Sequence, residues 1–217
     1  MRRLKSFGLL LFSLSLLALF CATQQDTSGV KYGKVYVSGE NPVLRLRLNE
    51  QDKTFVTNAS LWRIVYSPAG IGHICYITSD ITGDGPSPDD VRAIFTDNES
   101  LLEYMNREIM TRYLKDPLPV HKATFTATGD SLKEWVEVVK SDAYTIVLIW
   151  RDFGEAFLVD SPIGGDMKFG ISSLGIPAKK AEVYINGIKA VGRPFPEMIG
   201  KMQNSTARLW WAETWVK

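Results

Sequence analysis

The feature that most constrains the fold of this chain is an alternation of apolar and charged side chains with a period of two. The clearest example is Val43–Leu48, which reads V-L-R-L-R-L. In an extended segment Leu44, Leu46 and Leu48 lie on one face, and the two arginines lie on the other. This pattern is typical of an antiparallel strand that has one face in the core and one face in water.

Similar short runs, bounded by Gly, Pro, Asn and Asp, recur along most of the chain. We predict further strands at Leu61–Tyr66, Ile71–Ser79, Val91–Phe95, His121–Thr128, Leu132–Lys140, Ala143–Arg151, Glu155–Asp160, Met167–Leu174, Ala181–Asn186, Ile188–Val191 and Thr206–Lys217. Asn186-Gly187 is the sequence of a type I′ hairpin turn, because both residues tolerate a positive φ. A short helical turn is predicted at Pro196–Met202.

One segment has the period of a helix instead. Its apolar stripe consists of Leu102, Met105, Ile109 and Tyr113. Thr96, followed three residues later by Glu99, forms a capping box, and the approach to Pro117 favours an end of the helix. We therefore predict a helix over Asp97–Leu114 that packs on a sheet through its single apolar stripe.

About ten strands and one helix predict a mainly β protein, all-β or α+β, with a strongly curved antiparallel sheet or a closed barrel. Closure of a barrel removes the exposed edges that so many strands would otherwise carry. The architecture is lipocalin-like in that general sense only, because no G-x-W motif lies near the first strand and the helix precedes most of the strands. No Pro/Ser/Gly-rich linker divides residues 26–217, so we expect a single β-rich domain there.

Residues 1–20 have the pattern of an export signal. Arg2, Arg3 and Lys5 form a basic region, which is followed by an uncharged run of 14 residues, Phe7–Phe20. This run is shorter than the roughly 20 residues that a membrane-spanning helix needs. We expect residues 1–20 to be absent from the mature protein and the protein to be exported, to the periplasm or outer envelope or to the extracellular space.

Cys21 leaves two forms of the mature N-terminus open. Its position resembles that of the lipidated cysteine in the lipobox of bacterial lipoproteins, although Phe20 stands where a small residue is expected. Cleavage after Thr23 is the alternative and gives a secreted protein without lipid. A lipid anchor at Cys21 is the only contact with a membrane that the sequence predicts.

Composition and charge indicate whether nucleic acid, metal ions or cofactors are expected as partners. Apolar residues make up 45% of the chain and charged residues 23%, as in ordinary soluble globular proteins. Removal of residues 1–20 takes away three of 25 Lys and Arg and none of 24 Asp and Glu, so the net charge changes from +1 to −2. Such a chain gives no reason to expect a nucleic-acid partner. It also has no CxxC, P-loop or zinc motif, so we expect no metal and no cofactor.

His73 and Cys75 are predicted on the same face of one strand. Two chemical roles are open to such a pair: a thiolate–imidazolium pair, or two ligands of a metal ion. No third residue is spaced to orient the histidine. A small buried thiol beside a hydrogen-bonded histidine is therefore the favoured interpretation.

The segment from Asp80 to Gly85 reads D-I-T-G-D-G and resembles the first half of a calcium-binding loop. Thr82 and Val91 stand where a ligand and the bidentate Glu are expected, however. A polar turn, in which carboxylates accept hydrogen bonds from backbone amides, is the favoured interpretation.

Tryptophans are the most informative residues for function, and all six lie after residue 20. The period of two puts Trp211, Glu213 and Trp215 on one face of the last strand, which we expect to face the interior of the curved sheet. Arg208 and Trp210 then lie on the other face. Tryptophans with a few charges are typical of a small-molecule cavity, but tryptophan also fills barrel cores. The candidate ligand-binding residues are Trp211, Trp215, Glu213, His73 and Trp150.

Three functions are consistent with these patterns. The favoured one is an exported protein that binds a small apolar or aromatic molecule. The first alternative is an interaction or structural protein of the cell envelope with a filled core. The second is an enzyme that uses a barrel cavity for acid–base chemistry, which needs titratable groups that converge in a pocket. The candidate proton carriers are His73, His121, Asp80 and Glu213.

Overall fold

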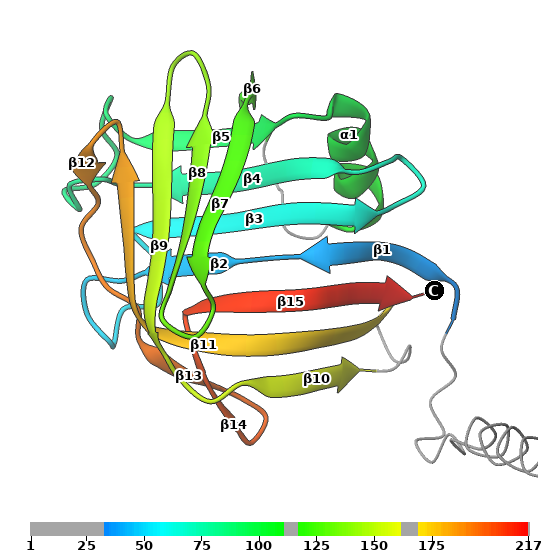
Figure 1. Cartoon of the computed structure of the whole chain (residues 1–217). Coiled ribbons are helices and arrows are strands. Elements are labelled where there is room, and N and C mark those ends of the chain that lie inside the picture. The colour runs from blue at the N-terminus through cyan, green and yellow to red at the C-terminus, as the bar shows by residue number, and fades with distance from the viewer. Residues whose placement is uncertain (1–32, 111–116, 162–168, 217) are drawn as a thin grey trace, which may run out of the picture. The chain divides into compact units, whose positions relative to one another are not determined.

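A single large β-sheet dominates the computed structural model, which describes residues 33–110, 117–161 and 169–216 (Figure 1). The elements are β1 Val35–Glu40, β2 Val43–Leu46, β3 Thr57–Tyr66, β4 Gly72–Ser79, β5 Val91–Thr96, α1 Glu99–Glu108, β6 Val120–Lys122, β7 Thr124–Asp130, β8 Glu134–Lys140, β9 Thr145–Phe153, β10 Phe157–Ser161, β11 Gly170–Ile185, β12 Ile188–Lys189, β13 Pro196–Ile199, β14 Met202–Ser205 and β15 Ala207–Val216. The predicted signal segment, Cys21, both boundaries of the predicted domain, and Tyr113 lie outside the described residues.

The sheet is strongly curved because one long strand belongs to both of its halves. Its main order is β6-β5-β4-β3-β1-β15-β11-β9-β8-β7, and all its pairs are antiparallel except β5–β6. Residues 170–178 of β11 pair with β15, and residues 178–185 pair with β9. Strands β7, β8 and β9 therefore cross over β3, β4 and β15 (Figure 1). The prediction of a mainly β fold with a strongly curved antiparallel sheet is confirmed, and the result is barrel-like.

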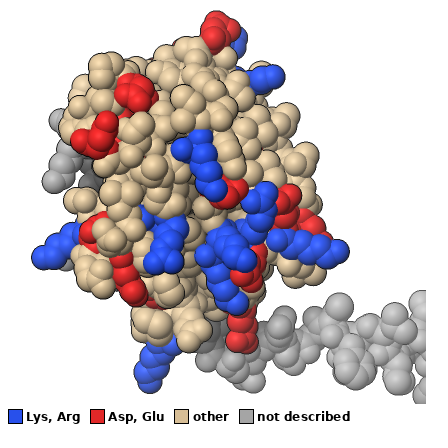
Figure 2. Space-filling model, turned by 90° about the vertical axis from the view of Figure 1, so that its left-hand side faces the viewer, with Lys and Arg blue, Asp and Glu red and all other residues tan. Residues whose placement is uncertain are grey.

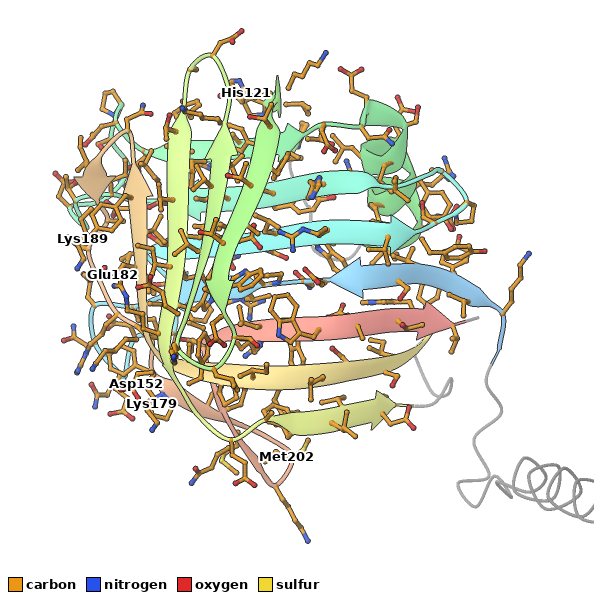
Figure 3. All side chains as sticks on the ribbon, viewed as in Figure 1. His121, Asp152, Lys179, Glu182, Lys189 and Met202 are labelled. Carbon is orange, nitrogen blue, oxygen red and sulfur yellow. The ribbon has the colours of Figure 1, made fainter. Side chains whose placement is uncertain are left out.

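Apolar side chains fill the space between the two halves of the sheet (Figure 3). Trp150 of β9 is fully buried there, and its Nε1 donates a hydrogen bond to the Val43 carbonyl at 3.0 Å. Leu44, Leu46 and Cys75 belong to the same cluster. The predicted alternation therefore holds within β2, where Leu44 and Leu46 face this core. Leu48, which was predicted on the same face, lies beyond the end of β2 and is exposed.

Helix α1 lies on the opposite face of the sheet, as its single apolar stripe predicts. Leu102, Met105 and Ile109 are buried in a second apolar cluster with residues of β3, β4 and β15. The N-cap is Asn98, whose Oδ1 accepts from the Leu101 amide at 3.0 Å, and not Thr96. Thr96 stays in the ladder of β5, so the helix begins two residues later than the capping box indicates. It also ends earlier than predicted, at Glu108.

Several strand predictions need correction. β1 was not predicted, and the segment His121–Thr128 is divided into β6 and β7. Pro196–Met202 is not a helical turn: it belongs to the β13–β14 hairpin, in which Gly200 (φ 59°) supplies the turn. The two segments predicted around Pro177 form one strand, β11. At Asn186-Gly187 (φ 51° and 82°) the predicted hairpin turn is confirmed.

Charged side chains of both signs lie next to one another on the face shown in Figure 2. Asp152 lies 3.4 Å from the ammonium of Lys180, and Glu182 pairs with Lys189 and Arg151 (Figure 3). These exposed pairs contribute little to stability, about 0–1 kcal/mol each. Within the described ranges, no helix has the length and apolar character that crossing a membrane requires.

Candidate functional site

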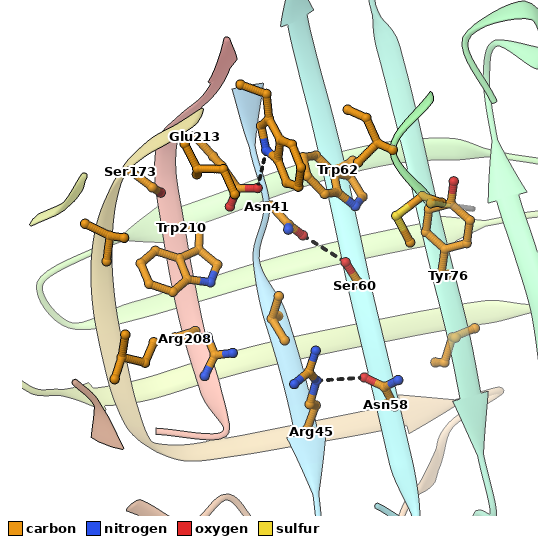
Figure 4. A pocket seen from close by; sticks show the side chains of 18 of the residues that line it. Asn41, Arg45, Asn58, Ser60, Trp62, Tyr76, Ser173, Arg208, Trp210 and Glu213 are labelled. Carbon is orange, nitrogen blue, oxygen red and sulfur yellow. Dashed lines mark hydrogen bonds between the residues drawn. The ribbon is translucent and has the colours of Figure 1, made fainter. Parts of the chain in front are cut away.

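A cavity of about 490 Å³ lies on the face of the sheet that carries α1, and not in the filled interior. Its floor is formed by β2, β3, β4 and β15, and β10, β11, β13 and the end of α1 contribute to its walls. Figure 4 shows Ser173, Glu213, Trp210 and Arg208 on one side of it, Asn41 and Arg45 in the middle, and Trp62, Ser60, Asn58 and Tyr76 on the other side. The lining is mainly aromatic and aliphatic, with a few polar groups.

A β-bulge in β15 decides which residues of the last strand reach this cavity. The register with β11 changes from Leu174–Trp211 to Ser172–Thr214, so β15 contains one extra residue. Ala212 has φ 50°, a left-handed conformation that is uncommon for a residue with a side chain. An extra residue inverts the alternation of faces beyond it.

This bulge corrects the predicted facing of the C-terminal tryptophans. Trp211 packs against the interior core, as predicted, and the centroid of its ring lies 5.1 Å from that of Trp135. Trp215 and Glu213 do not share its face. They lie with Arg208 and Trp210 on the cavity side.

Of the five candidate ligand-binding residues, the structure brings two to the cavity, Glu213 and Trp215. Trp150 and Trp211 belong to the interior core, and His73 lies beside Asp97. Trp62 and Asn41 also line the cavity and were not among the candidates. The sequence does indicate the position of Trp62, because neighbouring residues of a strand point to opposite faces and Leu61 faces the interior core. No such pattern indicates the position of Asn41, in the bend between β1 and β2.

Glu213 is buried at the cavity wall. Its Oε1 accepts a hydrogen bond from Trp215 Nε1 at 2.8 Å. Burial raises the pKa of Glu213 to about 7, although hydrogen bonds from Trp215 and Asn41 and the charge of Arg208 act in the opposite direction. Near neutral pH this carboxyl group therefore exists in both protonation states.

Arg208 is the buried cation of the cavity. Its Nη1 donates to the Ser205 carbonyl at 2.8 Å and pairs with Glu197 of β13, and its guanidinium lies 5.4 Å from the Trp210 ring. Its Nε has no hydrogen-bond partner in the described part of the chain, and the same holds for Trp62 Nε1. Buried N–H groups without an acceptor are rare, so the cavity wall carries two unused donors.

His73 belongs to a separate hydrogen-bonded chain at the edge between the two halves of the sheet. Its Nδ1 lies 2.6 Å from Asp97 Oδ2, and its Nε2 lies 3.3 Å from Arg63 Nε. Arg63 also donates to both oxygens of the fully buried Glu137, at 2.8 and 2.9 Å. Both ring nitrogens of His73 therefore have partners, and Asp97 orients the ring, although the sequence spacing offered no residue for this. His73, Asp97 and Arg63 line a separate pocket and not the cavity described above.

The other two motifs follow the favoured interpretations. Burial, and then the negative charge of Glu137, raise the pKa of Cys75 to about 12, so it remains a buried thiol and does not form a thiolate with His73. The Asp80 carboxylate accepts hydrogen bonds from the amides of Gly83 and Gly85 at 2.6 and 3.0 Å, as in a polar turn. Over the described ranges, no group of three or more His, Cys, Asp and Glu is arranged to hold a metal ion.

Of the four candidate proton carriers, Glu213 alone lines the cavity. His121 stacks on Phe95, with ring centroids 5.2 Å apart, and lies edge-on to Tyr144. Asp80 is held by its own turn, and His73 by Asp97 and Arg63. The four candidate proton carriers therefore do not converge in one site.

Comparison with known proteins gives a weak structural likeness. No family model and no curated protein matches the chain. A solved structure from structural studies of acetoacetate decarboxylase is similar, with a TM-score of 0.41 and 10% sequence identity, over 89% of this chain and 93% of that chain.

Proposed function

We propose that this chain is an exported protein that binds a small apolar or aromatic molecule in the cavity floored by β2, β3, β4 and β15. The observation that carries the proposal is the cavity itself, about 490 Å³ with Trp62, Trp210 and Trp215 in its wall. Small-molecule sites have volumes of roughly 300–1,000 Å³ and combine an apolar lining with a few polar groups that fix orientation. Both conditions hold here.

The three tryptophans differ in how they support binding. Trp62 and Trp215 are buried and pack at a tilt, with centroids 6.2 Å apart, so they form a fixed part of the wall. Trp210 is half-buried, and its ring lies edge-on to Phe157 at 5.7 Å. Trp210 therefore offers the ring surface that a ligand covers with least rearrangement.

The two alternative functions account for part of this arrangement. The filled interior agrees with a structural protein, but a structural role leaves the cavity on the outer face unexplained. Glu213 favours an enzyme, because a carboxyl group with a pKa of about 7 can donate or accept a proton at neutral pH. Ligand binding is common to the enzyme and the binding protein, and it is the property to test first.

Wild-type protein is expected to enhance the fluorescence of the neutral apolar dye N-phenyl-1-naphthylamine. Trp210→Ala is expected to weaken dye binding about tenfold, because it removes the exposed ring surface of the cavity, worth about 1.4 kcal/mol. Leu132→Ala is the matched control, since Leu132 is 82% exposed and lies outside the cavity. Titrations by fluorescence measure both affinities. Absence of dye binding, or equal affinity in Trp210→Ala, contradicts the proposal.

Export depends on residues 1–21, which lie outside the described residues. The intact mass of the protein, purified from cells that make the full chain, is expected to lack residues 1–20. If Cys21 is the first residue, the mass also includes its lipid, and Cys21→Ser removes that increment. A mass equal to that of all 217 residues contradicts export.

A further inference from the structure

We propose that the cavity takes its ligand as an apolar carboxylate, with the carboxylate held by the Arg208 guanidinium and a proton held on Glu213. This inference rests on the proposed function, because it names the chemical class of the ligand in the same cavity. Arg208 and Glu213 belong to one strand, β15, and both line the cavity with Trp210 between them in sequence.

The contacts of Arg208 leave one edge of its guanidinium for a ligand. The Nη1 side is occupied by the Ser205 carbonyl and by Glu197. The Nε atom, on another edge, has no partner among the described residues, although Arg208 is only 8% exposed. A guanidinium edge donates two parallel N–H bonds, and a carboxylate is the group whose two oxygens fit this geometry. Because Nε is covered in this structure, a ligand reaches it only if the Arg208 side chain moves.

The charges of the cavity favour an anion when Glu213 is protonated. The titratable residues that line it, within the described ranges, are Glu213 and Arg208 of β15, Arg45 of β2 and Tyr76 of β4. Arg208 is also paired with Glu197 of β13, which lies outside the lining, so with Glu213 protonated the lining residues themselves carry positive charge and no negative charge. When Glu213 ionises, a carboxylate ligand has to lie near a second negative charge in a poorly solvated place, which is unfavourable.

Two neighbouring side chains hold the Glu213 carboxyl group in position. Trp215 Nε1 donates to its Oε1. The Asn41 side chain is a second partner of Glu213, and Asn41 Oδ1 already accepts from the Ser60 hydroxyl at 2.9 Å. The amide nitrogen of Asn41 is therefore the atom available to Glu213.

The expected consequence is that ligand binding and proton binding are coupled. Burial raises the pKa of Glu213 to about 7 in the free protein. A bound carboxylate raises that pKa further, so the affinity for a carboxylate falls as the pH rises through 7. With about nine-tenths of Glu213 protonated at pH 6 and about one-tenth at pH 8, the affinity ratio is about tenfold.

The test compares 4-phenylbutyrate with its neutral analogue 4-phenylbutanamide by isothermal titration calorimetry. At pH 8 in HEPES and in Tris, buffers that differ in ionisation enthalpy, the butyrate is expected to bind with uptake of about one proton. It is expected to bind about tenfold more tightly at pH 6. The amide is expected to bind without proton uptake and with no such pH dependence.

Variants separate the two residues. Glu213→Gln keeps the shape and a hydrogen-bonding group, and it is expected to abolish proton uptake and the pH dependence while butyrate still binds. Arg208→Lys loses the paired N–H donors and is expected to weaken butyrate binding at least tenfold with little effect on the amide. Near-equal melting temperatures establish that these variants are folded, and Glu213→Gln remains decisive if Arg208→Lys does not fold.

Three outcomes overturn the inference, and the measurements distinguish them. Binding of the naphthylamine dye and of the amide, without tighter binding or proton uptake by butyrate, overturns the carboxylate inference and leaves the proposed function standing. Unchanged proton uptake in Glu213→Gln overturns it as well. If neither phenylbutyl compound nor the dye binds, the proposed function fails, and the inference fails with it.

Discussion

Arg63→Met is expected to lower the free energy of unfolding by about 3–5 kcal/mol, because it leaves a buried carboxylate without its countercharge. Glu137 of β8 is fully buried, and Arg63 of β3 donates to both of its oxygens. Arg63 also pairs with Glu40 of β1 and donates to His73 of β4. This one side chain therefore connects the two halves of the sheet, and denaturant unfolding at pH 7 measures its contribution.

The matched control is the double variant Arg63→Met with Glu137→Gln. It removes the buried charge together with its partner, and the glutamine oxygen can still accept the hydrogen bond that Trp135 Nε1 now gives to Glu137 at 2.9 Å. Most of the lost stability is expected to return, since a buried ion pair replaced as a whole costs little. If the double variant is as unstable as Arg63→Met, packing of the Arg63 side chain and not its charge is the cause.

The pH dependence of Arg63→Met has a defined sign. Burial raises the pKa of Glu137, and Arg63 opposes that rise. Loss of Arg63 raises the pKa of Glu137 in the folded state further above its pKa in the unfolded state. The unfolded state then binds fewer protons than the native state above the unfolded pKa of about 4.3, so stability falls as the pH rises. The deficit of the variant relative to wild type is expected to shrink between pH 7 and pH 5.

Met105→Asp is expected to cost at least about 4 kcal/mol, because it replaces a fully buried apolar side chain by a charge with no partner. Met105 lies at the centre of the stripe by which α1 packs on the sheet, with Leu101 and Leu102 in the same cluster. Met105→Leu conserves the volume and is expected to cost less than about 1.5 kcal/mol. Thermal unfolding distinguishes the two. A neutral effect of Met105→Asp contradicts the packing of α1.

Much of the sheet could be predicted because its strands obey local rules. The alternation in Val43–Leu46, the turn at Asn186-Gly187 and the helical stripe from Leu102 to Ile109 each depend on a few neighbouring residues, and the structure confirms them. Leu48, predicted on the same face as Leu44 and Leu46, lies beyond the strand and is exposed. The strands that were missed or misassigned, β1 and β13–β14, are short and have weak alternation. Their partners, such as β15 for β1, are distant in sequence.

The cavity could be predicted only in part, and one residue explains most of the difference. Ala212 is not a residue type that favours positive φ, so nothing in W-W-A-E-T-W indicates a bulge. Without the bulge, Trp211 and Trp215 share a face. With it, Trp215 and Glu213 join Arg208 on the cavity side. Asn41 and Trp62 meet them only through the pairing of β15 with β1 and β2, and of those with β3, which no local pattern encodes.

The position of β15 between β1 and β11 also determines the order in which this molecule can assemble during synthesis. β15 leaves the ribosome after every other described strand, and until then β1 and β11 lack the neighbour that joins them. Pairing between segments so far apart in sequence is slow to form. A nascent chain with this topology stays incompletely folded until translation has passed Val216. That delay suits the proposed export, since a polypeptide that crosses a membrane in an extended form has to reach the translocation machinery before its sheet closes.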